Sequence, residues 1–432
     1  MKQKYFCLLI FLLFVFRIIY GLCSEFWFVD ELQIYLIGLK SFTTGTWPFY
    51  GPDIVYTNTQ IPGALQGLLV SIPFYLLKIP ESPILFLNIL SFGSLSFLAW
   101  YISKRIDGIP KWLIWTLVMT TPWTLYYSTR VINPSYVLVF SIPFFLAIFE
   151  LLPIYKEKII HPKLAFFVIG LATTLIMQLH MSFVLLIPFT GLVFWEVLRT
   201  SPRKLMIYIP LFLLGMLIGL STLIPTYIYP DLLEKSTSSN IIFNLSNFQN
   251  IVTILMRFLS FASFEIPYML GGDTPERLNV ITSQIWITPF AAFLLVVGFL
   301  QVGLFVIAFF LNKEKTEWKR IKWLTFFSWL LIFVSFFFSI KGPSSHTFYL
   351  MLPIPVLYSF YCYQWLITKR GYVLKYLKII AVCGIFFHIG LGLYNYQNKS
   401  LYVNREKVVK ALDKMDYKIL GQRRAEVWGH GY

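Results

Sequence analysis

The stretch SEFWFVDELQIYL, residues 24–36, directly follows an almost entirely apolar run, residues 5–23. Its acids Glu25, Asp30 and Glu31 lie among Trp and Phe, where the chain is expected to leave a lipid bilayer. The apolar side chains of this stretch fit an interfacial helix at the membrane boundary. Adjacent residues on a helix point about 100° apart, so Asp30 and Glu31 cannot share one task symmetrically.

A carboxylate beside apolar surface has its pKa raised above the usual value of about 3.9, because burial disfavours the charged form. A raised pKa makes the carboxylate a stronger general base toward a hydroxyl or an amine. One of Asp30 and Glu31 is then expected to face a cleft, while the other orients it or binds a positive group. The alternative is an interfacial helix whose acids only remain hydrated.

The composition places the whole chain in lipid. Of its 432 residues, 57% are hydrophobic and 13% are charged, about half the charged fraction of a soluble domain. The mean hydropathy is +0.70. Its net charge of +16 does not indicate nucleic-acid binding, because the basic residues lie in short loops between apolar runs. The sequence predicts an all-α polytopic membrane protein whose first span is retained.

Apolar runs long enough to span a bilayer recur up to residue 396. About eleven spans are expected, near 5–23, 83–102, 110–127, 134–155, 164–180, 182–198, 205–228, 286–311, 321–340, 346–367 and 374–396. Residues 63–79 form a further apolar piece, which we interpret as a juxtamembrane or re-entrant helix of the first outer loop. The spans and their loops define one transmembrane module, 1–396, and a short polar tail, 397–432.

The distribution of Lys and Arg predicts the orientation of the spans. With the N-terminus cytoplasmic, the inner segments hold 19 of these residues and the longer outer connections hold 6, as the positive-inside rule requires. The two large outer loops are then 24–82 and 229–285. The tail is an exception, because it holds eight Lys and Arg yet is placed outside.

The first outer loop contains DELQIYLIGLKSFTTGTWPFYGPDIVYTNTQIPGAL, residues 30–65. This loop resembles that of the polyprenol-phosphate-sugar-dependent glycosyltransferases of the GT-C fold, the protein O-mannosyltransferase and aminoarabinose-transferase relatives. The shared features are an Asp-Glu pair, a Tyr-bearing helix, a Gly-x-x-Pro turn and a Pro leading back to the membrane. They fall here on Asp30-Glu31, Tyr35, Gly45–Pro48 and Pro62.

The resemblance implies a GT-C-like bundle with juxtamembrane helices in this loop, and it assigns the role of catalytic base to Asp30, with Glu31 beside it. Some relatives place a Lys just before the returning Pro, where it contacts the lipid phosphate. Here the stretch reads Thr59-Gln60-Ile61-Pro62, without a cation. A positive partner for phosphate must therefore come from elsewhere in the chain.

Arg130 is the candidate for this cation. It lies in YYSTRVINPSYVL, residues 126–138, in a short outer loop. Asn133 suits the N-cap and Pro134 the first turn of the next helix, and a helix N-terminus beside an Arg is an anion site. The alternative is an Arg whose side chain reaches the lipid headgroups.

Four further residues of the predicted outer face are candidate substrate-binding residues: Asp53, His180, Lys341 and His346. Bacterial GT-C-like sequences often show a Gln-x-His at the first His and a polar-aromatic-Pro stretch at the second. The alternatives are hydrogen-bonded interfacial histidines, and a turn residue at Asp53. A divalent metal ion is a possible cofactor that would bridge carboxylate and phosphate, although no ligand spacing demands one.

The resulting hypothesis is an inverting glycosyltransferase of the bacterial inner membrane. It takes a sugar from a polyprenyl-phosphate-linked donor lipid in the bilayer and passes it to an extracytoplasmic envelope acceptor, a glycolipid, polysaccharide or protein. The alternatives are a polytopic lipid or glycolipid transporter or flippase, and a scaffold without enzymatic activity. Transporters are expected to carry ionisable residues in mid-span. Here most ionisable residues lie at span ends, apart from Arg17, which disfavours a transporter.

Overall fold

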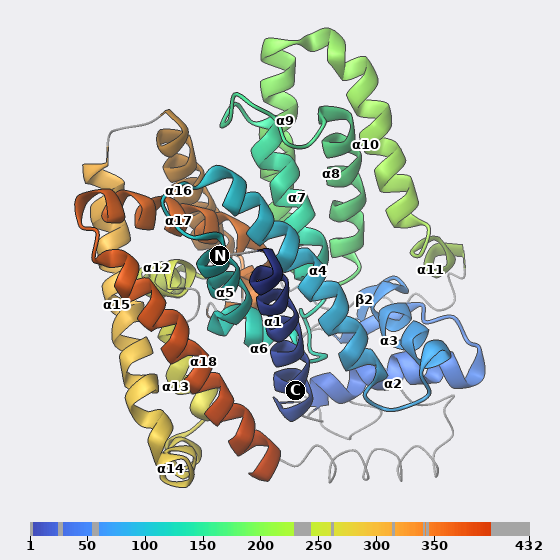
Figure 1. Cartoon of the computed structure of the whole chain (residues 1–432). Coiled ribbons are helices and arrows are strands. Elements are labelled where there is room, and N and C mark those ends of the chain that lie inside the picture. The colour runs from blue at the N-terminus through green and yellow to red at the C-terminus, as the bar shows by residue number, and fades with distance from the viewer. Residues whose placement is uncertain are drawn as a thin grey trace.

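The computed structural model describes residues 3–24, 29–53, 60–228, 243–260, 263–312, 316–339, 342 and 345–398. At residues 29–32, 53, 345 and 398 it describes the backbone only. The predicted tail, 397–432, therefore lies almost wholly outside the described residues. Helices form most of the described chain, and a single pair of short strands is found within it (Figure 1).

The elements follow one another along the chain in two groups. The first group is α1 (Gln3–Ser24), α2 (Val29–Thr44), β1 (Tyr50–Asp53), β2 (Gln60–Pro62), α3 (Leu65–Leu76), α4 (Ser82–Arg105), α5 (Lys111–Thr120), α6 (Pro122–Ser128), α7 (Val137–Leu151), α8 (Pro162–Met177), η1 (Met181–Leu186), α9 (Ile187–Thr200), η2 (Pro202–Lys204), α10 (Leu205–Leu220) and α11 (Ile224–Ile228). The second group is η4 (Leu245–Asn250), α12 (Ile251–Leu259), η5 (Ser263–Glu265), α13 (Ile266–Leu270), α14 (Thr274–Ser283), η6 (Ile285–Ile287), α15 (Thr288–Leu311), α16 (Thr316–Phe336), η7 (Ser345–Met351), α17 (Pro353–Lys369) and α18 (Val373–Asn398).

Helical residues occupy each of the eleven expected spans, but fewer helices are long and apolar enough to cross a membrane unaided. Within the described residues six qualify, and a seventh is possible if the bent pair Leu245–Leu259 and Ser263–Leu270 counts as one span. The range 110–127, for example, is split into α5 and α6 at Pro122. The chain is thus a multi-pass helical membrane protein, and the expected count of about eleven spans is not confirmed.

The predicted first outer loop, 24–82, contains two helices in its described part, α2 and α3. Figure 1 shows α2 running across the lower end of the bundle, with α3 packed on it. Gly45 ends α2 with a positive φ of 67°, a conformation that glycine adopts without steric cost. β1 and β2 pair antiparallel, with Tyr50 opposite Pro62. The described part of this loop therefore forms a layer over one end of the bundle.

The second expected outer loop, 229–285, is not simply a loop in its described part. It contains α12, α13 and α14, and α12 buries Ile254 and Phe258 completely. These two residues lie four positions apart, so they share one face of the helix, and α12 packs with α15, α16 and α17. A segment expected outside the bundle is therefore partly inserted into it.

The centre of the molecule is formed by α7 and α17. In α7 nearly every side chain from Phe144 to Glu150 is buried, as is typical of a helix that is apolar on all sides. Glu150 is the charged residue of this stretch. Its carboxylate accepts hydrogen bonds from Arg105 Nη2 at 2.5 Å, from Tyr101 Oη at 2.6 Å and from the backbone N–H of Ile159 at 2.8 Å. This buried ion pair joins α4 to α7 near their ends.

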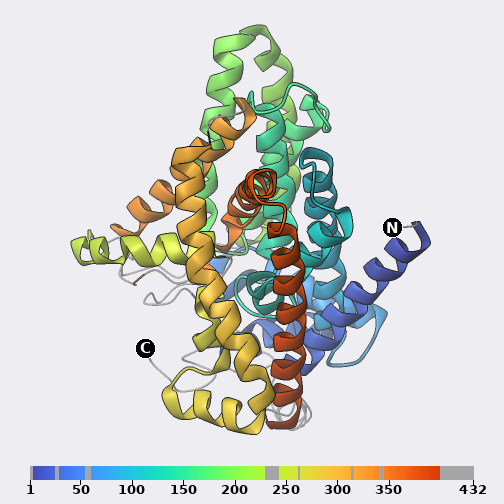
Figure 2. The ribbon, with the colours of Figure 1, turned by 60° about the vertical axis from the view of Figure 1, so that its left-hand side comes forward.

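Helix α10 shows how the bundle meets lipid. Its apolar side chains are largely exposed, and Met206 is 81% exposed, while its buried residues are Gly215 and Gly219. A Cβ at Gly215 would overlap the backbone of α8 at Phe167. Close packing through Gly-x-x-x-Gly is typical of membrane helix pairs. Figures 1 and 2 place the α9–α10 hairpin at the end of the molecule opposite to α14.

Candidate functional site

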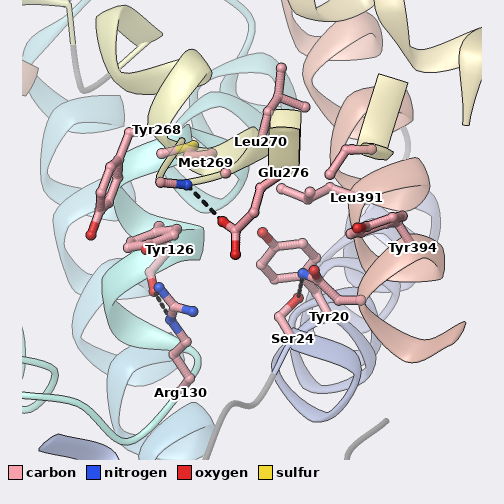
Figure 3. A pocket seen from close by; sticks show the side chains of 14 residues that line it. Tyr20, Ser24, Tyr126, Arg130, Tyr268, Met269, Leu270, Glu276, Leu391 and Tyr394 are labelled. Carbon is pink, nitrogen blue, oxygen red and sulfur yellow. Dashed lines mark hydrogen bonds between the residues drawn. The ribbon is translucent and has the colours of Figure 1, made fainter. Parts of the chain in front are cut away.

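A pocket of about 240 Å³ opens between five helical segments at the end of the bundle where α14 lies (Figure 3). Its volume is many times the roughly 10–15 Å³ that holds one water. The pocket is lined by Tyr20, Ser24, Tyr126, Arg130, Tyr268, Met269, Leu270, Gly271, Gly272, Glu276, Val280, Leu391, Tyr394 and Asn395. Of the three predicted site residues whose side chains the structure describes, Arg130 is in this set.

Arg130 lies two residues after the end of α6 and is 4% exposed. Its guanidinium carbon lies 3.7 Å from the centre of the Tyr126 ring, a cation–π contact. Its Nε donates to the Tyr126 carbonyl oxygen at 3.2 Å, at the helix end where backbone carbonyls favour a cation. The contact with Tyr126 directs the guanidinium into the pocket region that Figure 3 shows.

The segment before Arg130 is fixed by buried polar contacts with α4. Asn88 donates to the Thr129 carbonyl oxygen at 2.8 Å, and Ser91 donates to that of Ser128, also at 2.8 Å. All four residues are buried. Since a buried carbonyl without a partner is costly, these bonds hold the backbone immediately before Arg130 in one place.

Arg17 of α1 supports the same segment from the other side. Its side chain is fully buried and donates to the Met119 carbonyl oxygen at 2.7 Å, to that of Thr124 at 3.2 Å and to Ser128 Oγ at 2.7 Å. Met119 lies in the last turn of α5, whose carbonyls lack partners within the helix. Arg17 therefore supplies hydrogen-bond donors to carbonyl oxygens at the break between α5 and α6. Its role in the structure is to hold these helices together.

The helix start predicted beside Arg130 is wrong. Asn133–Pro134 is a cis peptide bond within a turn, and α7 begins at Val137. Ser135 closes this turn, because its hydroxyl accepts from the N–H of Ile132 at 2.8 Å. Arg130 is thus positioned by the end of α6 and by Tyr126, and the start of α7 does not lie beside it.

Four of the predicted site residues have side chains outside the described residues. Asp30 and Glu31 lie in the first turn of α2 by their backbone, and Asp53 ends β1, opposite Gln60 of β2. Lys341 lies outside the described residues altogether. The tyrosines and Glu276 that line the pocket were not among the sequence candidates.

His180 and His346 lie next to each other, although they are 166 positions apart in the chain. Their ring centres are 6.5 Å apart. His180 caps η1, since its Nδ1 accepts from the Ser182 N–H at 3.1 Å. Neither histidine is among the described residues that line the pocket, so the predicted candidates are divided between two places.

Gly63 of the predicted first outer loop packs against Gln178, two residues before His180. This fully buried side chain donates to the Gly219 carbonyl oxygen at 2.8 Å and accepts from Thr222 Oγ1 at 2.8 Å. Gly63, with a φ of 111°, lies so close to it that a Cβ would be 2.5 Å from Gln178 Oε1. Within the described residues, no group of three or more His, Cys, Asp or Glu is arranged to hold a metal ion.

No protein-family model matches this sequence, and a search of curated proteins finds no match. Among solved structures, the chain is similar to the crystal structure of ArnT from Cupriavidus metallidurans bound to undecaprenyl phosphate. The TM-score is 0.56 at 11% identity, over 100% of this chain and 85% of that chain. At this identity the similarity shows the fold alone. The chain has an ArnT-like fold, which confirms the predicted GT-C resemblance at the level of architecture.

Proposed function

We propose that this chain is an integral membrane glycosyltransferase. It moves a sugar from a polyprenyl-phosphate-linked donor to an extracytoplasmic envelope acceptor, with inversion at the anomeric carbon. The observation that carries this proposal is the position of Arg130, a buried cation in a tyrosine-lined pocket, within an ArnT-like fold. The similar ArnT structure was solved with undecaprenyl phosphate bound.

Arg130 is proposed to bind the donor phosphate. A guanidinium presents several N–H donors to phosphate oxygens, and its effect is greatest in a site that excludes water. Lys341 and His346 are proposed to assist it as the charge on the leaving phosphate grows. Asp53 and His180 remain candidates for contact with substrate.

Asp30 is proposed to be the general base. It accepts the proton of the acceptor hydroxyl or amine, whose lone pair forms a bond to the anomeric carbon from the face opposite the phosphate. The bond between this carbon and the phosphate oxygen breaks, and the electron pair leaves with the polyprenyl phosphate. Glu31 orients Asp30 or the acceptor. The proton on Asp30 is released to solvent before the next turnover.

The position of Asp30 in the chain supports this role. It follows Ser24, which lines the pocket, by six residues. Because an extended chain spans at most about 3.6 Å per residue, Asp30 is within about 20 Å of the pocket wall. The proposal places the N-terminus in the cytoplasm and the pocket on the extracytoplasmic side of the bacterial inner membrane. A divalent metal ion, if one binds, would be held by carboxylates of this face and would offset the charge of the phosphate.

The test is transfer by purified protein in detergent, with undecaprenyl-phosphate-linked sugars as donors and an extract of envelope glycolipids as acceptor. Asp30→Asn is expected to bind donor like the wild type and to transfer nothing, because an amide does not accept the proton. Asp107→Asn is the matched control, an exposed acid in another loop. Unchanged turnover by Asp30→Asn would reject Asp30 as the base.

The acceptor is sought by mass spectrometry of envelope glycans from cells with and without the intact gene. A glycolipid, polysaccharide or glycoprotein that loses one sugar in the deletion identifies the acceptor class. Identical glycans in both strains, together with movement of labelled lipid by the protein in vesicles that lack acceptor, would favour a transporter.

A further inference from the structure

The pocket has a second charged group, Glu276 of α14, at the rim opposite the α1 side (Figure 3). It lies in GGDTPERL, residues 271–278. Asp273 is the N-cap of α14, and its Oδ1 accepts from the Glu276 N–H at 2.8 Å. A Cβ at Gly271 would lie 2.6 Å from the Glu276 Cβ. Glycine at 271 therefore allows the turn to pass directly beside Glu276.

The same turn orients the Glu276 carboxylate. Its Oε2 accepts from the Gly272 N–H at 2.9 Å. Arg277 holds the turn in place, with Nε donating to the Gly271 carbonyl oxygen at 3.0 Å and Nη2 to that of Gly272 at 3.2 Å. Figure 3 shows the other carboxylate oxygen pointing into the pocket, in the space between Tyr126 and Tyr20.

The charges of the pocket determine what each part of it can bind. A carboxylate only accepts hydrogen bonds, so Glu276 requires a donor such as a hydroxyl or an amine. A phosphate carries negative charge and is repelled by Glu276, whereas Arg130 attracts it. The prenyl chain has no hydrogen-bond donor. Of the parts of a polyprenyl-phosphate sugar, the sugar ring alone suits Glu276.

The walls between these two charges are aromatic. Tyr20, Tyr126, Tyr268 and Tyr394 come from α1, α6, α13 and α18 and surround the space beside Glu276. Tyrosine combines a flat apolar face with one polar group. A pocket with such walls and a few placed polar groups is typical of a site that fixes the orientation of a small molecule.

We propose that Glu276 is a specificity-determining residue that accepts hydrogen bonds from the hydroxyl or amine groups of the donor sugar, while the phosphate binds at Arg130. This inference rests on the proposed function. The competing interpretation is that Glu276 only stabilises the start of α14, where an acid three residues after the N-cap commonly bonds back to the chain.

The variant Glu276→Gln separates the two interpretations. Glutamine also forms this bond at the helix start, so folding is preserved while the charge is lost. Glu157→Gln, in an exposed loop, is the matched control. Binding is measured by native mass spectrometry with undecaprenyl phosphate and with its glucose, mannose and N-acetylglucosamine conjugates.

The wild type is expected to bind at least one conjugate more tightly than undecaprenyl phosphate. Glu276→Gln is expected to lose about tenfold or more in affinity for that conjugate and less than about twofold for undecaprenyl phosphate. An equal loss for both lipids, no loss, or no conjugate preferred by the wild type overturns the role of Glu276. Failure of the wild type to bind undecaprenyl phosphate overturns the proposed function itself, which is a separate result.

Discussion

Gly21 of α1 lies against the backbone of Thr129, the residue before Arg130. A Cβ at Gly21 would overlap the Thr129 carbonyl oxygen and lie 2.9 Å from Asn88 Nδ2. Asn88 Nδ2 donates a hydrogen bond to this same carbonyl oxygen, so both bonded atoms lie against Gly21. The absence of a side chain at position 21 is therefore part of what positions Arg130.

Gly21→Ala is expected to destabilise the protein by about 1–3 kcal/mol, because an added methyl group must displace buried backbone. Affinity for undecaprenyl phosphate is expected to fall as well, since the segment before Arg130 moves. Gly93→Ala in α4 is the control, because nothing lies within 4 Å of an added Cβ there. Thermal unfolding in detergent and lipid binding are measured, and equal behaviour of the two variants would contradict the role of Gly21.

Arg130→Gln is expected to weaken binding of undecaprenyl phosphate by about tenfold or more, the contribution of a charge-assisted hydrogen bond. Arg199→Gln serves as control, since this arginine is exposed and pairs only with Glu196 on its own helix at 3.5 Å in the described part of the chain. Binding is measured by native mass spectrometry. Wild-type affinity in Arg130→Gln would remove Arg130 from the phosphate site.

Arg17→Met removes the donors that satisfy Met119, Thr124 and Ser128. Because buried acceptors then lose their partners, the expected cost is about 1–3 kcal/mol of unfolding free energy. Arg17→Lys is expected to recover part of this loss, since Lys keeps the charge but lacks the planar arrangement of donors. Thermal unfolding in detergent is the measurement, and a variant as stable as the wild type would show that the contacts of Arg17 are dispensable.

Local signals in the sequence predicted the helix that carries Tyr35 and the turn at Gly45–Pro48. Gly45 ends α2 where a glycine is expected after a helix, and Tyr35 is buried against Phe74 between α2 and α3. Pro48 contacts α3 at Gly67, where a Cβ would lie 2.5 Å from the Pro48 Cβ. These features depend on backbone geometry and on residues close in the chain, which a sequence displays directly.

Other features depend on contacts that the sequence does not display. Proline is compatible both with a helix start and with a cis turn, so Pro134 alone did not distinguish them. The pocket combines side chains from α1, α6, α13, α14 and α18, and no local pattern joins Tyr20 to Glu276. The helical spacing of Ile254 and Phe258 is a signal in the sequence that indicates their burial. The polar residues around α12 obscured this signal.

The dependence of Arg17 on distant acceptors has a consequence for how the chain enters the bilayer. Its partner Met119 is 102 positions further along the chain, so it is synthesised well after α1 has left the ribosome. An unpaired arginine within a membrane helix carries a penalty of up to about 2.5–3.5 kcal/mol on insertion scales. The contacts that satisfy Arg17 can therefore form only after α5 and α6 have been synthesised.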